Sequence, residues 1–314
     1  MKKPLVILTG PTAVGKTELS IRLAKKINGE IISADSMQVY RRMDIGTAKI
    51  KQEEMQGVSH YLIDLLEPTQ EFNVVKFQEY ALGAMQEIYA KGKIPIIVGG
   101  TGFYIQSVLY GIDFKENEED STYRKELEEL AQVKGQDFLH DELKKVDENS
   151  AKSIHPNNVK RVIRALEYYK QTGLKISEHN EEQRQKESLY NFCYFVLTNE
   201  REILYDRINL RIDKMLEAGL LEEVKGLLDS GCTKDMISMQ GLGYKEIISY
   251  LQGESTLEEA IYLLKRDTRH FAKRQLTWFK REKDVTWIEK NKHEDKDDKI
   301  LEVLCEHLRL KDII

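Results

Sequence analysis

Cysteine and proline are scarce in this chain, and long apolar runs are missing from it. Its 314 residues include 5 prolines and three distant cysteines, Cys193, Cys232 and Cys305. No C-x-x-C pair occurs, so the sequence carries neither a zinc-binding signature nor a disulfide framework. No 18-residue apolar run exists, which argues against a membrane-spanning helix. We therefore expect a protein of the reducing cytoplasm that has no membrane partner.

An excess of positive charge is also missing. The chain has 48 Lys and Arg against 53 Asp and Glu, a net charge of −5. The sum weakly disfavours a nucleic-acid partner, although the distribution of charge along the chain decides more. The composition, 41% hydrophobic and 32% charged, is that of a globular protein. The length exceeds one average domain and predicts a core with an inserted or appended part.

The first third of the chain alternates short apolar runs with amphipathic segments. Strand-like runs occupy Leu5–Thr9, Glu30–Asp35, Tyr61–Leu65 and Ile94–Val98, and helical spacing occupies Thr17–Ile27 and Val74–Tyr89. The first run leads into a glycine motif instead of a cleavage site, so we interpret it as a strand and not as a signal peptide. Apolar strands that alternate with helices predict an α/β fold with a parallel sheet covered on both faces.

The composition changes after Gly111. Residues 115–148 are strongly charged and favour helix, helical spacing continues through 158–171, and 178–188 is polar, typical of a loop or a surface helix. A strand-like run returns at 192–198, followed by helical segments at 201–282 and 295–310. A helical stretch between two strands of one sheet indicates an insertion. We predict a core domain formed by 1–114 and 190–314 and a helical insertion at 115–189.

One motif predicts phosphate binding. The segment G-x-x-x-x-G-K-[ST] follows a strand and opens a helix: Gly10-Pro11-Thr12-Ala13-Val14-Gly15-Lys16-Thr17. In that context successive backbone N–H groups and a helix N-terminus form a cradle for an anion. Lys16 can neutralise phosphate charge, and the Thr17 hydroxyl can bind Mg²⁺. A pyrophosphate satisfies such a cradle as well as a nucleotide does.

Two further segments follow predicted strands. Asp35 closes the second strand, where it can bind Mg²⁺, accept a proton from a nucleophile, or simply cap the next turn. Gly99-Gly100-Thr101-Gly102 follows the Ile94–Val98 strand. Its glycines permit close approach of the backbone to a ligand, with the Thr101 hydroxyl facing that ligand, although a plain turn has the same composition.

Basic residues gather in two helical segments. Lys160, Arg161 and Arg164 follow a cap at Asn157 or Asn158. Residues 264–283 carry eight Lys and Arg against two acids, +6 in an otherwise acidic chain. An opposite stripe of Leu264, Thr268, Phe271, Gln275 and Trp278 predicts one packed face, with His270, Trp278 and Phe279 among the charges. Such a helix suits the phosphates and unstacked bases of single-stranded RNA, although basic helix faces are often only solvated.

Together these motifs resemble the bacterial tRNA dimethylallyltransferases, also called isopentenyltransferases. The resemblance covers nearly the whole chain and depends on many segments in the same order: 10–17, 35–41, 46–49, 99–104, 155–167, 240–246 and 272–279. None of these motifs departs from the family pattern. The zinc finger of eukaryotic members is absent, in agreement with the three cysteines.

The resemblance implies a reaction and roles for particular residues. Dimethylallyl pyrophosphate is the expected donor, and N6 of adenosine 37, beside the anticodon, is the expected acceptor. Asp35 matches the general base, and Lys16 and Thr101 match catalytic positions. Thr17 with Mg²⁺, Arg207 and Arg211 match pyrophosphate ligands, ion pairs being the alternative for the arginines. The implied tRNA contacts are Asp35, Ser36, Met37, Gln38, Thr101, Arg124, Asn158, Lys160, Arg161, Arg164, Lys273 and Arg274.

Three other functions remain open from the residues alone. A nucleotide or small-molecule kinase shares the phosphate-binding loop but consumes ATP. An adenylate isopentenyltransferase acts on free AMP and needs neither the insertion nor the basic helix. A non-catalytic RNA-binding module has no use for Asp35 and Thr101 at strand ends. We expect a monomer that binds the anticodon stem-loop.

Overall fold

The computed structural model describes residues 2–114 and 121–314, and they form two compact units. One unit comprises Met1–Leu109 and Leu189–Ile314, and the other comprises Tyr110–Ser188. The predicted insertion, 115–189, has limits close to these boundaries. The start of its predicted helical region, 115–120, lies outside the described residues.

The larger unit is built on one parallel sheet. Its six strands are arranged in the order β3-β2-β4-β1-β5-β6, and every pair of neighbours is parallel. Their bounds are β1 Lys3–Thr9, β2 Gly29–Ala34, β3 His60–Tyr61, β4 Ile94–Gly99, β5 Tyr190–Thr198 and β6 Val285–Glu289. The predicted α/β fold is thereby confirmed.

The centre of the sheet is apolar on both faces. Leu5, Val6, Ile7 and Leu8 of β1 have no exposed surface. A strand buried on both sides reads as a continuous hydrophobic run, which is why it was recognisable without alternation. Because all strands are parallel, their carboxyl ends meet at one edge of the sheet, and the segments that follow Thr9, Ala34 and Gly99 lie there together.

Two strands differ from the sequence interpretation. The run Tyr61–Leu65 contributes only His60–Tyr61 to the sheet. Leu62 and Asp64 adopt left-handed backbone conformations, with φ of 63° and 54°, and these break the extended run. The edge strand β6, Val285–Glu289, was not predicted, because it is short and only Ile288 in it is buried.

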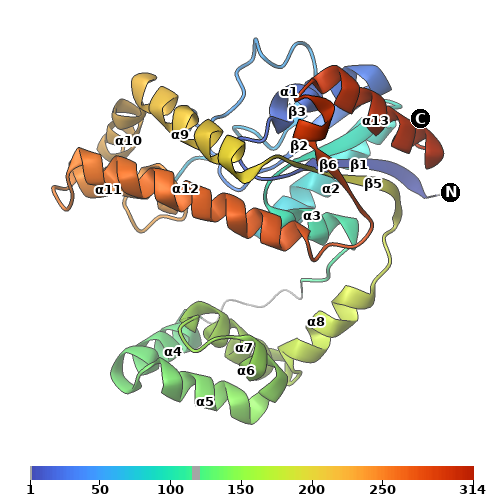
Figure 1. Ribbon diagram of the computed structural model, residues 1–314. Helices are drawn as coiled ribbons and strands as arrows, with labels where there is room; N and C mark the ends of the chain where they lie inside the picture. The colour runs from blue at the N-terminus through green and yellow to red at the C-terminus, as the bar shows by residue number, and fades with distance from the viewer. Residues whose placement is uncertain (1, 115–120) are drawn as a thin grey trace. The chain divides into compact units, whose positions relative to one another are not determined.

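Helices cover both faces of the sheet. Figure 1 shows α1 and α13 on one side and α2 and α3 on the other. Their bounds are α1 Lys16–Ile27, α2 Val74–Ala90, α3 Gly102–Leu109 and α13 Asp297–Leu310. Asn73 caps the start of α2, and its side chain accepts hydrogen bonds from the N–H groups of Val75 and Lys76. In the part of the chain that is described, none of the helices has the length and apolarity needed to cross a bilayer.

The region 201–282 is a series of helices and not one continuous helix. It contains α9 Arg201–Glu217, α10 Leu220–Asp229, η1 Ser238–Gln240, α11 Tyr244–Leu251 and α12 Leu257–Phe279. Gly219 and Gly243, with φ of 99° and 95°, stand at the starts of α10 and α11 in a conformation that favours glycine. Helix α12 begins with a capping box in which Thr256 and Glu259 satisfy each other's backbone N–H groups.

The smaller unit consists of helices around a core of its own. They are α4 Ser121–Lys134, α5 Gln136–Val146, α6 Glu148–Ser153, α7 Val159–Thr172 and α8 Ile176–Gln185. The core includes Leu139, Leu143, Val162 and Leu166. The polar segment 178–188 is therefore largely helical, one of the two alternatives open from its composition.

A buried acid joins three helices of this unit. Asp147 accepts hydrogen bonds from the backbone N–H of Ser150 at 2.9 Å and of Ser177 at 3.0 Å, and from both serine hydroxyls at 2.7 Å. Asp147 is 1% exposed. These bonds satisfy a charge that would otherwise be expensive to bury.

Candidate functional site

A pocket of about 420 Å³ opens at the carboxyl ends of the strands in the larger unit. Four cations and one carboxylate line it, in a setting where developing or bound negative charge is stabilised. Its lining residues are Thr12, Ala13, Gly15, Lys16, Thr17, Asp35, Gln38, Thr47, Gly100, Arg207, Leu210, Arg211, Lys214, Phe271 and Gln275.

The phosphate-binding motif forms the floor of this pocket. Gly10 has φ of 143°, and a Cβ there would lie 2.4 Å from the Leu197 carbonyl oxygen, so the position requires glycine. Gly15, with φ of 93°, is the N-cap of α1 and supplies no side-chain hydrogen bond. The first N–H groups of α1 therefore remain available to an anion.

Lys16 is a partly buried cation that forms no ion pair within the described residues. Its ammonium group donates to the carbonyl oxygens of Gly10 at 2.9 Å and Pro11 at 2.8 Å. Burial lowers its pKa to about 7, and the nearby Arg211 guanidinium adds to this effect, while Asp35 opposes it. An anion in the pocket would stabilise the charged form and raise this pKa again.

Two arginines face the same pocket from α9. Arg207 and Arg211 are four residues apart and share one face of the helix, as predicted. Arg211 donates to the Thr12 hydroxyl at 3.4 Å, and burial lowers the pKa of its guanidinium, which nevertheless stays charged. Arg207 is partly compensated, because it lies 3.3 Å from Asp295. Lys214, one turn further along, also lines the pocket and was not predicted.

Asp35 caps the turn after β2, one of the roles considered from the sequence, and it also faces the pocket. Its Oδ1 accepts hydrogen bonds from the backbone N–H of Met37 at 2.8 Å and of Gln38 at 3.3 Å, so it fixes the turn after β2. Asp35 also lines the pocket, and no hydrogen bond to Oδ2 occurs within the described residues. One carboxylate oxygen is thus committed to the fold and the other is available to a ligand.

Gln275 is a site residue that the sequence pattern assigned to a packed face. Its Oε1 accepts from the backbone N–H of Thr12 at 2.9 Å, and its Nε2 donates to the Gly100 carbonyl at 3.0 Å. A Cβ at Gly100 would lie 2.1 Å from this Nε2, so the glycine makes room for the bridge. A glutamine on an otherwise apolar stripe was the signal available for this role. Phe271, from the same stripe, lines the pocket.

Several predicted ligands are near the pocket but do not line it. Thr101 is not among the residues that line the pocket. Its backbone N–H donates to the Ala34 carbonyl at 3.2 Å. Ser36 and Met37 lie in the turn that Asp35 caps. Gly10, Pro11 and Val14 are buried within the motif and shape its backbone.

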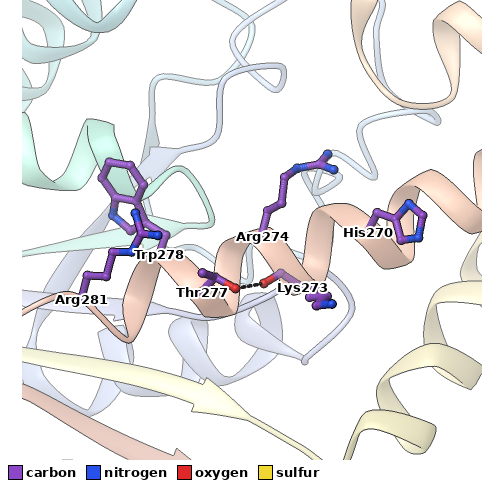
Figure 2. Close-up of a pocket in the computed structure, with 6 residues that line it drawn as sticks. All are labelled: His270, Lys273, Arg274, Thr277, Trp278 and Arg281. Carbon is purple, nitrogen blue, oxygen red and sulfur yellow. Dashed lines mark hydrogen bonds between the residues drawn. The ribbon is translucent and has the colours of Figure 1, made fainter. Parts of the chain in front are cut away.

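The basic helix α12 carries a second hollow, of about 470 Å³. Figure 2 shows the residues that line it along one face: His270, Lys273, Arg274, Thr277, Trp278 and Arg281. Phe279 is not among these charges, which corrects the sequence interpretation. It is fully buried because it lies four residues after Gln275, on the packed face of the helix.

The cations of α12 and of the turn that follows it fall into two groups. Near the start of the basic segment they have partners within the protein: Lys265 with Asp213, Arg266 with Asp267, and Arg269 with Asn209. Lys273, Arg274 and Arg281 are exposed and form no ion pair within the described residues. This second group is available to a polyanion.

The predicted contacts of the helical unit differ in exposure and in role. Arg124 holds the buried Glu167 through two hydrogen bonds, of 3.0 and 2.9 Å, so at least part of its role is structural. Lys160, Arg161 and Arg164 lie on the exposed face of α7. Asn158 is the N-cap of that helix, without a side-chain cap bond.

A magnesium ion would find few protein ligands here. Among the described residues, no group of three or more His, Cys, Asp or Glu side chains is arranged to hold a metal. Mg²⁺ often binds through one or two protein oxygens together with phosphate oxygens and water. The Thr17 hydroxyl, at the pocket rim beside Lys16, fits that kind of site.

Comparison with known proteins identifies relatives along the whole chain. The family model described as IPP transferase matches residues 38–282. A curated relative from Lachnoclostridium phytofermentans, named tRNA dimethylallyltransferase, is 66% identical over 312 residues and covers 99% of both chains. One with the same name from Acetivibrio thermocellus is 53% identical over 97% of each chain.

Solved structures of similar proteins have the same architecture. The full-length tRNA isopentenylpyrophosphate transferase of Bacillus halodurans is 47% identical, with a TM-score of 0.74 over 99% of this chain and 98% of that one. A eukaryotic dimethylallyltransferase, described as acting on tRNA, is 32% identical, with a TM-score of 0.77 over 91% of this chain and 74% of that one.

Proposed function

The chain belongs to the IPP transferase family, and we propose that it transfers a dimethylallyl group from dimethylallyl pyrophosphate to N6 of adenosine 37 in tRNA. The observation that carries this proposal is the single pocket that joins an anion cradle to one carboxylate. Lys16, Arg207, Arg211 and Lys214 supply the positive charge, and Asp35 is the only acid in the lining.

The cations act on the leaving group. As the bond between the allylic carbon and the pyrophosphate oxygen lengthens, negative charge grows on the pyrophosphate. Lys16, Arg211 and the free N–H groups of α1 are positioned to stabilise that charge. Mg²⁺, held by Thr17 and the phosphate oxygens, would supply additional positive charge at the same place. We include Mg²⁺ as part of the proposal.

The acid acts on the nucleophile. N6 of adenine forms the new bond to the allylic carbon, the carbon–oxygen bond to pyrophosphate breaks, and N6 must lose one proton. Asp35 Oδ2 is available to take that proton, while Oδ1 keeps the carboxylate in place through the 36–38 turn. The adenine must leave its stack to reach the pocket.

Binding of the RNA requires cations outside the pocket. The exposed Lys273 and Arg274 on α12 and Arg281 just after it suit the phosphates of a single-stranded loop, and Trp278 beside them suits its bases. Lys160, Arg161 and Arg164 on α7 offer a further basic face. Contacts of this kind make binding depend on salt concentration.

Label transfer tests the proposal against its rivals. The protein is incubated with labelled dimethylallyl pyrophosphate, Mg²⁺ and an anticodon stem-loop RNA, in parallel with AMP as acceptor and with an ATP-only reaction. We expect label on the stem-loop RNA alone. Label on AMP would indicate an adenylate isopentenyltransferase, and ATP turnover without prenyl transfer would indicate a kinase.

A further inference from the structure

The loop between β2 and β3 forms one wall of the pocket. Its residues Gln38 and Thr47 are among the lining residues, although the loop contains no regular helix or strand from Ser36 to Lys49. Gln38 Nε2 donates to the Thr47 carbonyl at 3.3 Å, and Gln38 Oε1 accepts from the Ser33 hydroxyl at 3.2 Å. Because the loop lacks regular secondary structure, other hydrogen bonds and ion pairs must hold it if its side chains are to keep a fixed geometry.

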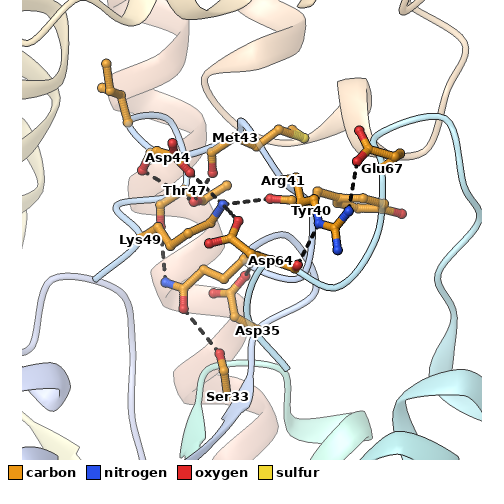
Figure 3. A network of polar contacts seen from close by, with 12 residues as sticks. Ser33, Asp35, Tyr40, Arg41, Met43, Asp44, Thr47, Lys49, Asp64 and Glu67 are labelled. Atoms are coloured by element: carbon orange, nitrogen blue, oxygen red, sulfur yellow. Dashed lines mark hydrogen bonds and ion pairs between the residues drawn. The ribbon is translucent and has the colours of Figure 1, made fainter. Parts of the chain in front are cut away.

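One fastening comes from inside the loop. Figure 3 shows the Lys49 ammonium group directed toward Asp44, Asp64 and the backbone of Tyr40. The three distances are 2.6, 2.6 and 2.7 Å. The Lys49 side chain is 4% exposed, so this charge is desolvated and satisfied within the loop and its neighbour.

The other fastening is Glu223 of α10. Its carboxylate accepts hydrogen bonds from three successive backbone N–H groups, those of Asp44 at 2.8 Å, Ile45 at 2.7 Å and Gly46 at 3.0 Å. It also accepts from the Tyr244 hydroxyl at 2.7 Å. Hydrogen bonds to an ionised acceptor are about twice as strong as neutral ones, so a single side chain fixes the position of this turn.

The turn that Glu223 holds is continuous with the pocket wall. Gly46 packs directly against the Tyr244 ring, which a Cβ at Gly46 would approach to 2.6 Å. Thr47 follows, and it reaches Gln38 through the bond to its carbonyl. The N–H of Gln38 in turn donates to Asp35. An unbroken series of contacts thus joins α10 to the proposed base.

We infer that Glu223 is a positioning residue for prenyl transfer: it holds the 44–46 turn so that Thr47, Gln38 and Asp35 keep their places in the pocket. This inference rests on the proposed function. The phosphate-binding floor is built by a different segment, 10–17, so loss of Glu223 should affect the chemical step more than the affinity for pyrophosphate.

The test uses Glu223→Gln and a matched control. The amide keeps the size of the side chain but turns an N–H₂ group toward backbone donors. We expect kcat for label transfer to fall about 10- to 100-fold, as small misplacements of reacting groups do. The affinity for inorganic pyrophosphate and the KM for the stem-loop should change less than about twofold. The neighbouring exposed Glu222→Gln should behave as wild type in all three.

The outcomes separate the inference from the function. Wild-type protein that transfers no label contradicts the proposed function itself. Active wild type together with a folded Glu223→Gln variant of unchanged kcat contradicts the inference, as does an equal loss in Glu222→Gln. If circular dichroism shows that Glu223→Gln is unfolded, the Tyr244→Phe variant is used to test the inference. It removes one of the four hydrogen bonds to Glu223 and keeps the ring that packs against Gly46. Lower kcat at unchanged pyrophosphate affinity then supports the inference, and unchanged kcat contradicts it.

Discussion

Each end of the parallel sheet withdraws a charged side chain from water, fully at the amino end and partly at the carboxyl end, and the two charges have different partners. At the amino end, Glu30 of β2 is 2% exposed and is held by Lys93 at 2.7 Å, Tyr61 at 2.8 Å and Lys91 at 3.2 Å. Burial alone would raise its pKa, yet these hydrogen bonds lower it to about 2. At the carboxyl end, Lys16 has only carbonyl partners, and its pKa falls to about 7.

The difference distinguishes charge that stabilises the fold from charge kept for a ligand. Lys290 sharpens the contrast, because it lies close behind Gly15 but outside the pocket lining, and it is paired with Asp297 at 2.8 Å. Within the described residues, Lys16 and Arg211, two partly buried cations that line the pocket, form no ion pair. Perturbed groups of this kind are typical of functional sites.

The largest effect is expected at the one acid of the pocket. Asp35→Asn keeps an oxygen to accept from Met37 and Gln38 but cannot take a proton. We expect label transfer to fall about 10³- to 10⁴-fold, the scale of a lost general base. Affinities for inorganic pyrophosphate and for the stem-loop should be retained. Full turnover by this variant would remove Asp35 as the base.

Lys16→Met removes a charge at the carboxyl end of the sheet, and we expect it to affect the reaction but not the stability of the fold. Loss of one preorganised positive donor should lower transfer about 10²- to 10³-fold. Stability should not fall, because the folded-state pKa of Lys16 lies below its ordinary value of 10.5. The charged amine therefore disfavours folding at neutral pH, and removing it relieves that cost. Urea unfolding at pH 7.5 checks this second claim; a strong loss of stability would show that Lys16 serves the fold.

The two arginines of α9 test whether an ion pair within the protein reduces the contribution of a pocket cation to the reaction. Arg211→Met should lower transfer about 10²-fold, because within the described residues its guanidinium forms no ion pair. Arg207→Met should lower it only about 10-fold, because Arg207 is already shared with Asp295. Steady-state label transfer at saturating stem-loop RNA gives both ratios. Equal losses, or a larger loss for Arg207, would refute the grading.

Glu30→Gln removes the buried charge at the amino end of the sheet, and we expect it to affect the stability of the fold but not the reaction. We expect the free energy of unfolding to fall by about 2–3 kcal/mol at pH 7, since a buried paired charge is lost but both lysines can turn to water. The folded-state pKa of about 2 lies below the ordinary 4.5. The stabilisation is therefore complete above pH 4.5 and disappears as the pH falls toward 2. Transfer at pH 7 should be unchanged, and the exposed Glu53→Gln is the control.

The sequence predicted the features that local patterns encode. The strand, the glycine motif and the helix at residues 5–27 depend only on neighbours along the chain, and so does the pair Arg207 and Arg211 on one helical face. Asp35 was placed at a strand end for the same reason. A parallel sheet then brings such strand ends together, so the position of the pocket could be inferred without coordinates.

Features that depend on contacts between distant segments were not predicted. Gln275 bridges Thr12 and Gly100, which lie 263 and 175 residues away in sequence. Glu223 is one of many acids on helical surfaces, and only the fold shows that it faces three backbone N–H groups. The end of the Tyr61–Leu65 run depends on left-handed residues, which side-chain type does not specify at Leu62.

The ionisation of Lys16 tests the central claim most directly. Competitive labelling with a water-soluble acylating reagent, followed by mass spectrometry of the Lys16 peptide, gives its pKa in the intact protein. We expect half-maximal reactivity near pH 7 in the free protein, and a shift to higher pH with protection when inorganic pyrophosphate is added. Half-maximal reactivity near the ordinary value of 10.5 without pyrophosphate would contradict the account, because it would mean that the protein already compensates this charge.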